Sequence, residues 1–412
     1  MKKALVLAGG FPQIALIEEL KRRGYVTVLA DWYENPVARK HADIFYQVST
    51  LDVEAIRETA IKEKVDFLIT ACTDQALLTV AKVSEDLNLP CYIDYQTALK
   101  VTNKSYMKKV FAAHEIPTAR FHVMGELNET MLADLEYPLI VKPVDCNSSK
   151  GVKKAYNIEE LRAAFADAVR MSRTKTAIVE EFIDGPEMSV DVYIENGKAT
   201  VLSVTNSEKI AADDKFVIFR AKYPAVTNEE ILIQIHETAQ KIADAFHLTD
   251  SPMLVQMITD GRRIFVLEFS ARTGGGVKYQ LIKRISGFDV IGAVVDLTEG
   301  KKPHVKIQPA ESRYISNEFI YCYPGIFDHL DGFEELKKEG VLTDYFLFKW
   351  KGAEFDGVEN SGDRIAGFTI QADTVDEINR KHREAAKRLK VINIEGKDMM
   401  RHDLLTNLTF EI

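Results

Sequence analysis

Residues 176–204 read TAIVEEFIDGPEMSVDVYIENGKATVLSV, and this stretch decides the fold of the central part of the chain. Apolar and polar residues alternate on both sides of ENGK (195–198), which is typical of a tight turn between antiparallel strands. Residues 253–270 repeat the arrangement around Asp260-Gly261. The sequence therefore predicts two separate antiparallel regions.

Helices are expected between and beyond these strands. Pro117 ends a helix that begins near residue 104, because a proline forces the residue before it out of helical geometry. Apolar residues at helical spacing predict the other helices. This α+β portion is completed by the strand YPLIVKP (137–143) and by helices near 158–168, 228–247 and 374–390.

The first hundred residues follow a different pattern, in which short apolar runs alternate with helical ones. The expected strands are 4–9, 26–31, 65–70 and 89–93, with helices near 14–20, 52–63 and 75–88. This alternation predicts a parallel sheet covered on both faces, a Rossmann-like domain. GxGxxG is absent after the first strand, so no dinucleotide fingerprint is expected. Gly9-Gly10 leaves two interpretations open, a plain tight turn or backbone amides that hold an anion.

Composition excludes several classes of protein. With 412 residues, 46% of them hydrophobic and 28% charged, the chain has the balance of a multidomain globular protein. Its formal charge of −9 argues against nucleic acid or an anionic membrane as a partner. A symmetric homodimer is the expected assembly for a protein of this size.

The cysteines and the N-terminus indicate a reducing compartment. The cysteines lack the spacing of a zinc site or a disulfide framework, being scattered at Cys72, Cys91, Cys146 and Cys322. MKKALVLAGG (1–10) is interpreted as a first strand and not as a signal peptide. No run approaches the roughly 18 apolar residues of a membrane span. The expected location is the cytoplasm.

Two lysines stand where a phosphate could be held. Lys142 closes an apolar strand and precedes a small polar loop, DCNSSKG (145–151), whose amides and hydroxyls are donors. Lys104 follows the helix-capping Asn103, at a helix start that disfavours a cation. For both lysines the alternative is an ordinary solvated side chain.

Glu180, Glu181 and Glu187 surround a predicted strand-turn-strand. Adjacent residues of a strand point to opposite faces, so either Glu180 or Glu181 faces inward or lines a cleft. A buried carboxylate needs donors, which an amine or sugar hydroxyls can provide. The alternative is a solvated edge strand.

The stretch VLEFSARTGGG (266–276) presents a second set of polar groups. Glu268, Ser270 and Arg272 share one face if the strand persists. Gln256 lies on the partner strand, and carboxylate and amide oxygens suit magnesium. The alternative is a buried Glu268–Arg272 pair that braces a turn.

Taken together, these segments resemble the ATP-grasp superfamily. The order of Lys104, IVKP (140–143), VEEFIDGPE (179–187) and LEFSAR (267–272) is similar to the order and spacing of that superfamily's motifs. The resemblance is strongest between residues 100 and 276 and extends over about 1–390.

This resemblance implies a division of the chain into three parts. They are a Rossmann-like N-terminal domain (1–100), an ATP-grasp domain (101–300) with a lid subdomain at about 117–180, and a C-terminal α+β region (301–412).

The resemblance also implies how a nucleotide is held. Lys104 and Lys142 would contact the phosphates of ATP under a lid formed by the 146–151 loop. Glu180 and the backbone of 181–183 would hold adenine, and Glu187 the ribose. The residues implied to bind ATP are Lys104, Lys142, Ser148, Ser149, Gly151, Glu180, Glu181, Phe182, Ile183 and Glu187.

The catalytic and metal-binding roles follow from the same resemblance. Glu268 would bridge Mg²⁺, or Mn²⁺ in its place, to the phosphates, with Gln256 and Ser270 as further ligands and Arg272 acting in catalysis. Gln256 stands where the superfamily commonly has a carboxylate, and Ser270 where it commonly has asparagine. Neutral oxygens are weaker ligands than carboxylates, so Gln256 and Ser270 would hold a second metal ion less tightly than the usual residues.

The activity that the resemblance implies is an ATP-dependent ligase acting on small molecules. A carboxylate is activated as an acyl phosphate and joined to an amine, with release of ADP and phosphate. The alternatives are a bicarbonate-using carboxylase or carbamoyl-phosphate-type enzyme, and a nucleotide-binding regulatory protein without turnover. The acceptor pocket would draw on residues 73–75, 209–220 and 274–278.

Overall fold

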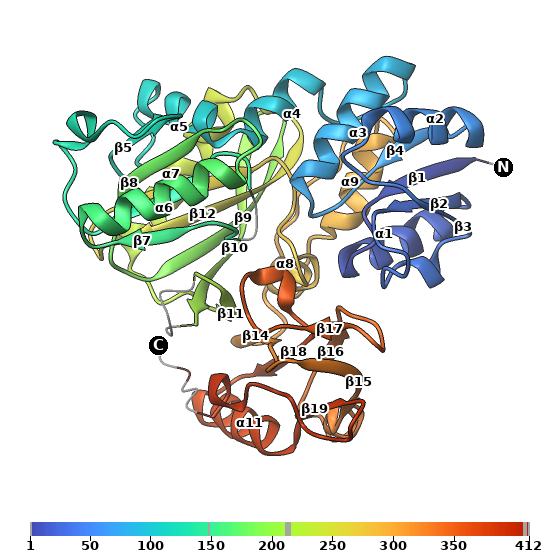
Figure 1. Cartoon of the computed structure of the whole chain (residues 1–412). Helices are drawn as coiled ribbons and strands as arrows, with labels where there is room; N and C mark the ends of the chain where they lie inside the picture. The colour runs from blue at the N-terminus through green and yellow to red at the C-terminus, as the bar shows by residue number, and fades with distance from the viewer. Residues whose placement is uncertain (1, 147–148, 211–215, 407–409, 411–412) are drawn as a thin grey trace.

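The structure is a computed structural model, and it describes residues 2–146, 149–210, 216–406 and 410. Its strands form four sheets. Figure 1 shows the N-terminal elements in blue on one side, the central elements mainly in green on the other, and the C-terminal elements in orange and red below them. The predicted combination of α/β and α+β architecture is confirmed. The domain boundaries at residues 100 and 300 stay predictions.

The N-terminal sheet is parallel and has the strand order β3-β2-β1-β4. Its strands are β1 (Lys3–Leu7), β2 (Val26–Asp31), β3 (Ile44–Gln47) and β4 (Phe67–Ile69). Helix α1 (Phe11–Arg22) packs on one face, while α2 (Val53–Glu63) and α3 (Asp74–Leu87) pack on the other. The sheet covered on both faces is therefore present as predicted.

The strand predicted at residues 89–93 is wrong. In its place the chain makes an irregular connection from α3 to α4 (Tyr95–Thr102). Asn88 takes a left-handed conformation with φ 53°, and Pro90 has no amide hydrogen to give to a sheet. The apolar side chains are still used, since Ile93 packs into the core of the central sheet. Strand β3, which pairs with β2 at the edge of the N-terminal sheet, was not predicted.

Gly9 belongs to the tight turn after β1. Its amide donates to Oδ2 of Asp31 over 2.6 Å, and a Cβ at this position would lie 2.5 Å from Cβ of Pro36. Because a carboxylate of the protein already takes this amide, the tight-turn interpretation holds for Gly9.

One late segment of the chain returns to the N-terminal sheet. Helix α9 (Val290–Thr298) packs beside α1, as the gold helix among blue elements in Figure 1 shows. Arg23 pairs with Asp296 at 2.6 Å and with Glu299 at 2.8 Å. These ion pairs and the shared apolar core join the N-terminal sheet to the central part of the chain.

A small antiparallel sheet follows, with the order β5-β8-β6-β7. Its strands are β5 (Phe121–Met124), β6 (Leu139–Pro143), β7 (Lys153–Ala155) and β8 (Ala177–Glu181). Helix α6 (Ile158–Met171) packs against it through Leu161, Phe165 and Ala168, the face that the sequence predicted.

The largest sheet has eight strands in the order β13-β12-β9-β10-β11-β14-β18-β16. Its strands are β9 (Glu187–Glu195), β10 (Lys198–Lys209), β11 (Ile218–Tyr223), β12 (Ser251–Thr259), β13 (Ile264–Ser270), β14 (Tyr314–Ile320), β16 (Asp344–Leu347) and β18 (Ala366–Ala372). The prediction of two separate antiparallel regions is wrong, because β12 pairs with β9 and joins both hairpins into one sheet. Turn sequences determine the hairpins but not which hairpins pair with each other.

The two faces of β9 differ in chemistry. Met188, Val190 and Val192 pack against α7 (Glu229–Ala245) and α5 (Lys104–Ala113) in one core. Glu187, Ser189 and Asp191 alternate with them and point to the opposite face. This buried polar face supports the candidate site.

The C-terminal elements complete the fold. Strands β15 (Gly325–Asp331), β17 (Glu354–Phe355) and β19 (Lys390–Asn393) form the fourth sheet, accompanied by α10 (Phe333–Lys338) and α11 (Val375–Arg388). Helix α8 (Lys278–Ser286) packs instead on the eight-stranded sheet, beside β10. Among the helices of the described residues, none has the length and apolar character needed to cross a membrane.

Candidate active site

A cavity of about 240 Å³ lies between the small antiparallel sheet and the eight-stranded sheet. Its walls are largely apolar and suit a planar base, being formed by Ile140, Phe182, Ile183, Phe216, Ile258 and Leu267. Charged side chains enter from both sheets. We call this space the first cavity.

Most of the residues predicted to bind ATP line the first cavity. They are Lys104, Lys142, Ser149, Glu180, Glu181, Phe182, Ile183 and Glu187, together with the predicted metal ligands Gln256 and Glu268. Gly151 does not line it, although its neighbours Lys150 and Val152 do. Ser148 lies outside the described residues. The roles assigned to these residues stay predictions.

Lys104 reaches the cavity from the first residue of α5. The side chain of Asn103 caps this helix by accepting from the amide of Tyr106 at 3.1 Å. Nζ of Lys104 donates to the carbonyl of Cys146 at 2.8 Å and lies 3.0 Å from Oε2 of Glu268. Burial opposes the charge of Lys104, but Glu268 outweighs it and raises the pKa of the ammonium. Lys104 is therefore not an ordinary solvated lysine.

Lys142 and Glu180 form a buried pair on neighbouring strands of the small sheet. Glu180 is 3% exposed, and its other oxygen, Oε2, lies 2.7 Å from Nζ of Lys108. Burial opposes ionisation of Glu180, but Lys108 and Lys142 outweigh it and lower the pKa of the carboxyl to about 2. Each carboxylate oxygen of Glu180, the residue predicted to hold adenine, thus lies against a lysine.

Lys108 is a residue that the sequence reasoning missed. It lies one helical turn after Lys104 on α5 and is only 1% exposed. Burial lowers the pKa of Lys108 to about 8, although Glu180 opposes this shift. The spacing of four residues was the available signal, because such residues share a helix face.

Replacing Lys108 with methionine is expected to lower the free energy of unfolding by about 3 kcal/mol, because Glu180 then keeps a single cationic partner in a buried place. Urea denaturation measures this change. Lys109→Met is the matched control, since Lys109 is exposed on the same helix and should change stability little. Equal stability of the two variants would contradict a buried charge cluster.

Glu187 and Gln256 occupy the floor of the cavity. Glu187 pairs with Lys209, and Nε2 of Gln256 donates to Oε1 of Glu187 at 3.1 Å. Gln256 stands opposite Glu268 in the strand register, as the sequence predicted. Because the amide nitrogen is directed at Glu187, the amide oxygen of Gln256 points away from it.

A second cavity of about 330 Å³ adjoins the first. Gln256, Glu268, Ile218 and Ser149 line both, so the two spaces meet at these residues. The rest of its wall comes from all parts of the chain and includes Thr73, Asp74, Arg272, Gly274, Lys278, Asn317 and Arg364. A molecule in the second cavity would therefore face a nucleotide in the first across Glu268.

Arg272 is directed into the second cavity by Asp74. Its Nε donates to Oδ1 of Asp74 at 2.7 Å, and Nη1 donates to the carbonyl of Thr273 at 2.8 Å. Burial opposes the charge of Arg272, but Asp74 outweighs it and raises the pKa of the guanidinium. The proposed Glu268–Arg272 brace is wrong, because each residue has a different partner.

The shared strand face predicted for Glu268, Ser270 and Arg272 holds only in part. Strand β13 ends at Ser270, so Arg272 already lies in the following turn. Ser270 is buried, and its hydroxyl hydrogen-bonds to Asp74. Ser270 lines neither cavity, while its predicted role as a metal ligand stays a prediction.

Lys278 and Arg364 add two further cations to the second cavity. Nζ of Lys278 lies 3.1 Å from Oδ2 of Asp191 and donates to Oγ1 of Thr205 at 2.6 Å. Arg364 donates to neutral oxygens, the hydroxyl of Tyr321 and the carbonyl of Ile218, each at 3.0 Å. Its guanidinium stacks on the ring of Phe319 at 3.7 Å. Arg364 therefore adds positive charge to the wall.

The predicted acceptor segments line these cavities in part. Thr73 and Asp74 line the second cavity, and so do Gly274, Gly275 and Lys278. From the segment 209–220, Ile218 lines both cavities, whereas Lys209 and Phe216 line the first. Residues 211–215 lie outside the described residues.

The oxygen donors at the junction fit one magnesium ion. Glu268 is the carboxylate that lines both cavities, and its side chain is one-third exposed. Over the described ranges, no group of three or more His, Cys, Asp or Glu side chains is arranged to hold a metal. Magnesium commonly uses one or two carboxylates and takes its remaining oxygens from phosphates and water, so this donor set suits it.

Comparison with known proteins supports the resemblance. Residues 135–280 match the family model of the ATP-grasp domain. The formate-dependent phosphoribosylglycinamide formyltransferase of Ignicoccus hospitalis is 25% identical over 405 residues, which cover 95% of this chain and 96% of that protein.

Solved structures share the fold over nearly the whole chain. The L-amino acid ligase of Bacillus licheniformis has a TM-score of 0.78 at 22% identity, covering 95% of this chain and 99% of that one. The biotin carboxylase domain of the Hydrogenobacter thermophilus 2-oxoglutarate carboxylase also has a TM-score of 0.78, at 16% identity, covering 98% of this chain and 93% of that one.

The chain thus contains an ATP-grasp domain, and the predicted ATP-grasp fold is confirmed. The predicted enzyme class, an ATP-grasp ligase that binds a nucleotide, is confirmed with it.

Proposed function

We propose that the chain activates a carboxylate as an acyl phosphate with ATP and joins it to an amine. The junction of the two cavities at Glu268 and Gln256 supports this proposal more than any other observation. It allows the γ-phosphate of a nucleotide in the first cavity to meet a carboxylate in the second.

The reaction has two bond-forming steps. A carboxylate oxygen attacks the γ-phosphorus, the bond from that phosphorus to the bridging oxygen of ADP breaks, and ADP leaves. The amine nitrogen then attacks the carbonyl carbon, the carbon–oxygen bond to phosphate breaks, and phosphate leaves. The proton lost by the amine passes to phosphate or water.

The residues of the chain bind and orient the groups in these steps. Lys104 and Lys142 offer ammonium groups to the phosphates. Arg272, whose Nε and Nη2 grip Asp74, offers the positive charge of its guanidinium to a carboxylate or phosphoryl group. Magnesium, when bound at Glu268, supplies positive charge to the β- and γ-phosphates. The Hydrogenobacter thermophilus carboxylase domain was solved with the magnesium salt of ADP, which supports this ion here.

The second cavity favours organic substrates over bicarbonate. Its volume of about 330 Å³ has room for an organic acid and an amine, whereas bicarbonate would fill a small part of it. The positive charge of Arg364 and Arg272 suits an anionic acceptor. The homodimer and the cytoplasmic location stay predictions.

A coupled assay of ADP release over a pool of carboxylates and amines tests the proposal. We expect turnover that needs magnesium, an organic acid and an amine together. Release with bicarbonate and no organic acid would instead support a carboxylase. Tight nucleotide binding without release under any combination would support a regulatory protein.

A further inference from the structure

A cluster of five charged side chains lies where the small antiparallel sheet meets the eight-stranded sheet. Its members are Lys104, Lys108, Lys142, Glu180 and Glu268. Four of them line the first cavity, whereas Lys108 lines neither cavity. Lys108 is therefore a charged residue of the cluster that does not reach the nucleotide.

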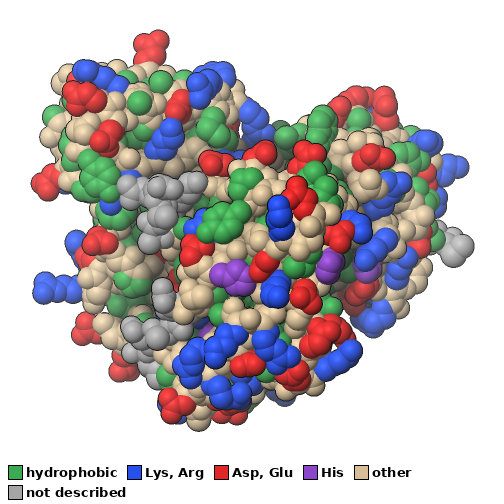
Figure 2. All heavy atoms as spheres, turned by 60° about the horizontal axis from the view of Figure 1, so that its bottom comes forward, with side chains coloured by type: hydrophobic (Ala, Val, Ile, Leu, Met, Phe, Trp, Pro, Cys, Tyr) green, Lys and Arg blue, Asp and Glu red, His purple; other side chains and the backbone are tan. Residues whose placement is uncertain are grey.

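The burial of Lys108 is unusual for a lysine. On the face that Figure 2 shows, acidic and basic side chains are interspersed at the surface, as expected for solvated groups. Lys108, by contrast, is only 1% exposed. A buried cation is costly unless its neighbours supply the opposite charge and hydrogen bonds, so Lys108 depends on the partners around it.

Lys108 contacts three separate segments of the chain. Its Nζ lies 2.7 Å from Oε2 of Glu180 on β8 and donates to Oγ1 of Thr118. It also lies 5.5 Å from the centre of the Phe121 ring, at the start of β5. Since α5 packs in the core of the eight-stranded sheet, Lys108 connects that sheet to the small one.

Thr118 lies in the connection that leads from α5 to the small sheet. Its hydroxyl donates to the carbonyl of Val266 at 2.8 Å, and the amide of Val266 donates to the carbonyl of Pro117 at 2.7 Å. Val266 belongs to β13 and stands two residues before Glu268. Through Thr118, Lys108 is therefore linked to the strand that carries the proposed metal ligand.

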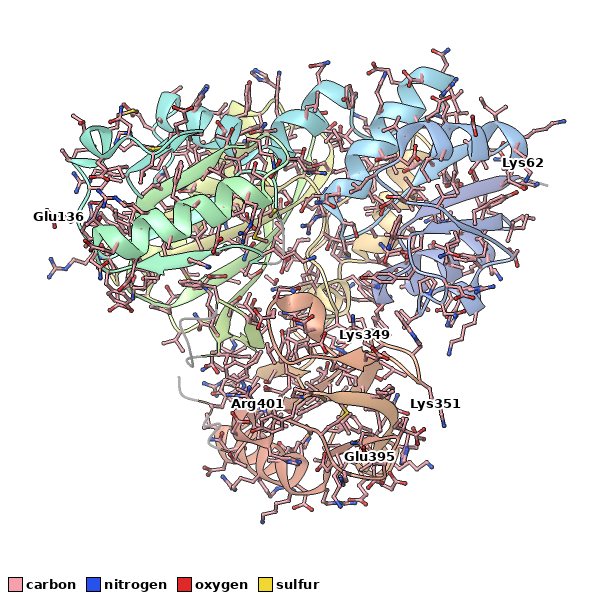
Figure 3. All side chains as sticks on the ribbon, viewed as in Figure 1. Lys62, Glu136, Lys349, Lys351, Glu395 and Arg401 are labelled. Atoms are coloured by element: carbon pink, nitrogen blue, oxygen red, sulfur yellow. The ribbon has the colours of Figure 1, made fainter. Side chains whose placement is uncertain are left out.

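Lys142 reaches the first cavity from the end of β6. Figure 3 labels Glu136 at the outer edge of the small sheet, and the chain runs from there into β6 and toward the cavity. Ile140 is the strand partner of Glu180, and Lys142 follows two residues later on the same face. Glu180 thus stands between Lys142 and Lys108.

These three residues together carry one net positive charge. Burial opposes the ionisation of Glu180, but the two lysines outweigh it and hold the pKa of the carboxyl at about 2. Burial lowers the pKa of Lys108 only to about 8, so its ammonium persists at pH 7. Without Lys108, Glu180 would neutralise Lys142, and the pair would present no net charge to a phosphate.

We propose that Lys108 is a positioning residue of the nucleotide site, which holds one oxygen of Glu180 so that Lys142 keeps its charge for the phosphates. This inference rests on the proposed role of Lys142 at those phosphates. Without Lys108, both oxygens of Glu180 would be free to take the ammonium of Lys142 and draw it from the nucleotide. Because Lys104 and Lys108 lie one turn apart on α5, the same contact aligns the two lysines proposed to bind phosphate.

Calorimetry with magnesium ADP at pH 7 tests the proposal. In Lys108→Met the dissociation constant for ADP should rise about tenfold or more, because the cluster loses its net positive charge. Lys109→Met is the matched control, since it removes a lysine that is exposed at the next position of α5. This control should bind ADP as the parent does.

A second substitution separates positioning from a general loss of stability. In Lys108→Met/Glu180→Gln the carboxylate that neutralises Lys142 is removed as well, so most of the lost ADP affinity should return. Replacing both partners of a buried ion pair costs far less stability than removing one of them. The double variant is therefore expected to fold, which thermal unfolding checks.

Thr118→Val tests the same contact without changing any charge. Valine keeps the shape of threonine but cannot accept the hydrogen bond from Lys108, so ADP should bind about threefold more weakly. Thr118→Ser keeps the hydroxyl and should bind ADP as the parent does. These two variants decide the question if Lys108→Met does not fold.

The proposal is overturned if folded Lys108→Met binds ADP as tightly as the parent, or if the double variant binds it no better than Lys108→Met. Equal affinity of Thr118→Val and Thr118→Ser would overturn it as well. Lys142→Ala locates such a failure. Weaker ADP binding in Lys142→Ala would keep the proposed role of Lys142 and confine the failure to Lys108, whereas unchanged binding would refute both.

Discussion

Glu268→Gln is expected to lower kcat about a hundredfold or more, while the protein keeps its fold. Glutamine preserves the shape of the side chain but removes the negative charge that attracts magnesium, and it adds a donor that cannot coordinate a cation. A loss of this size is on the order of 3 kcal/mol of transition-state stabilisation. The magnesium concentration that gives half-maximal turnover should rise in the same variant.

The structure separates this effect from a loss of stability. The side chain of Glu268 is one-third exposed and pairs with Lys104, so the pair itself contributes little to folding. Glu354→Gln on the exposed part of β17 is the matched control and should leave turnover unchanged. A kcat for Glu268→Gln within a few-fold of the parent would exclude a metal role for this carboxylate.

Arg272→Lys is expected to lower kcat by about 10² to 10³, because an ammonium cannot reproduce the two parallel hydrogen bonds of a guanidinium. Arg272 lines the second cavity and not the first. The dissociation constant for ADP should therefore stay at the parent value while the KM for the carboxylate rises. Steady-state kinetics and calorimetry with ADP measure both quantities.

Arg388→Lys is the matched control for this prediction. Arg388 also makes a two-point contact, with Glu339 at 2.5 and 2.7 Å, but on the surface of α11. Its replacement should leave kcat unchanged. If Arg272→Lys lowered only the melting temperature, and kcat of the folded protein were unaffected, Arg272 would be a structural partner of Asp74 and not a catalytic residue.

Local sequence rules predicted the strand partners at the centre of the site. The alternation of residues in a strand placed Glu180 and Glu181 on opposite faces, and the structure buries Glu180 while Glu181 pairs with Arg120 at 2.9 Å. The hairpin at Asp260-Gly261 likewise placed Gln256 across from Glu268. Both results depend on residues close together in the chain, where backbone geometry leaves few choices.

Contacts between distant segments could not be predicted in this way. Asp74 is the first residue of α3 and Arg272 lies in the turn after β13, and nothing in either local sequence selects the other as its partner. Arg364 enters the second cavity from the turn before β18, so its position depends on how the C-terminal strands extend the central sheet. Such partners are set by packing of whole elements.

The error at residues 89–93 has a related cause. A short apolar run is equally consistent with a buried strand and with a buried connection. Pro90 and the left-handed Asn88 favour the connection, and its apolar residues pack without pairing to a strand. The unpredicted β3 is only partly buried, which weakens the apolar signal that marks a central strand.

The central claim, that a carboxylate in the second cavity takes the γ-phosphate of ATP, can be tested by isotope transfer. A carboxylate substrate identified by the ADP-release assay is labelled with ¹⁸O in its carboxylate group, and the released phosphate is analysed by mass spectrometry. An acyl phosphate intermediate predicts one ¹⁸O atom in each phosphate formed with the product. Phosphate free of the label, released at the same rate as the product, would contradict the account.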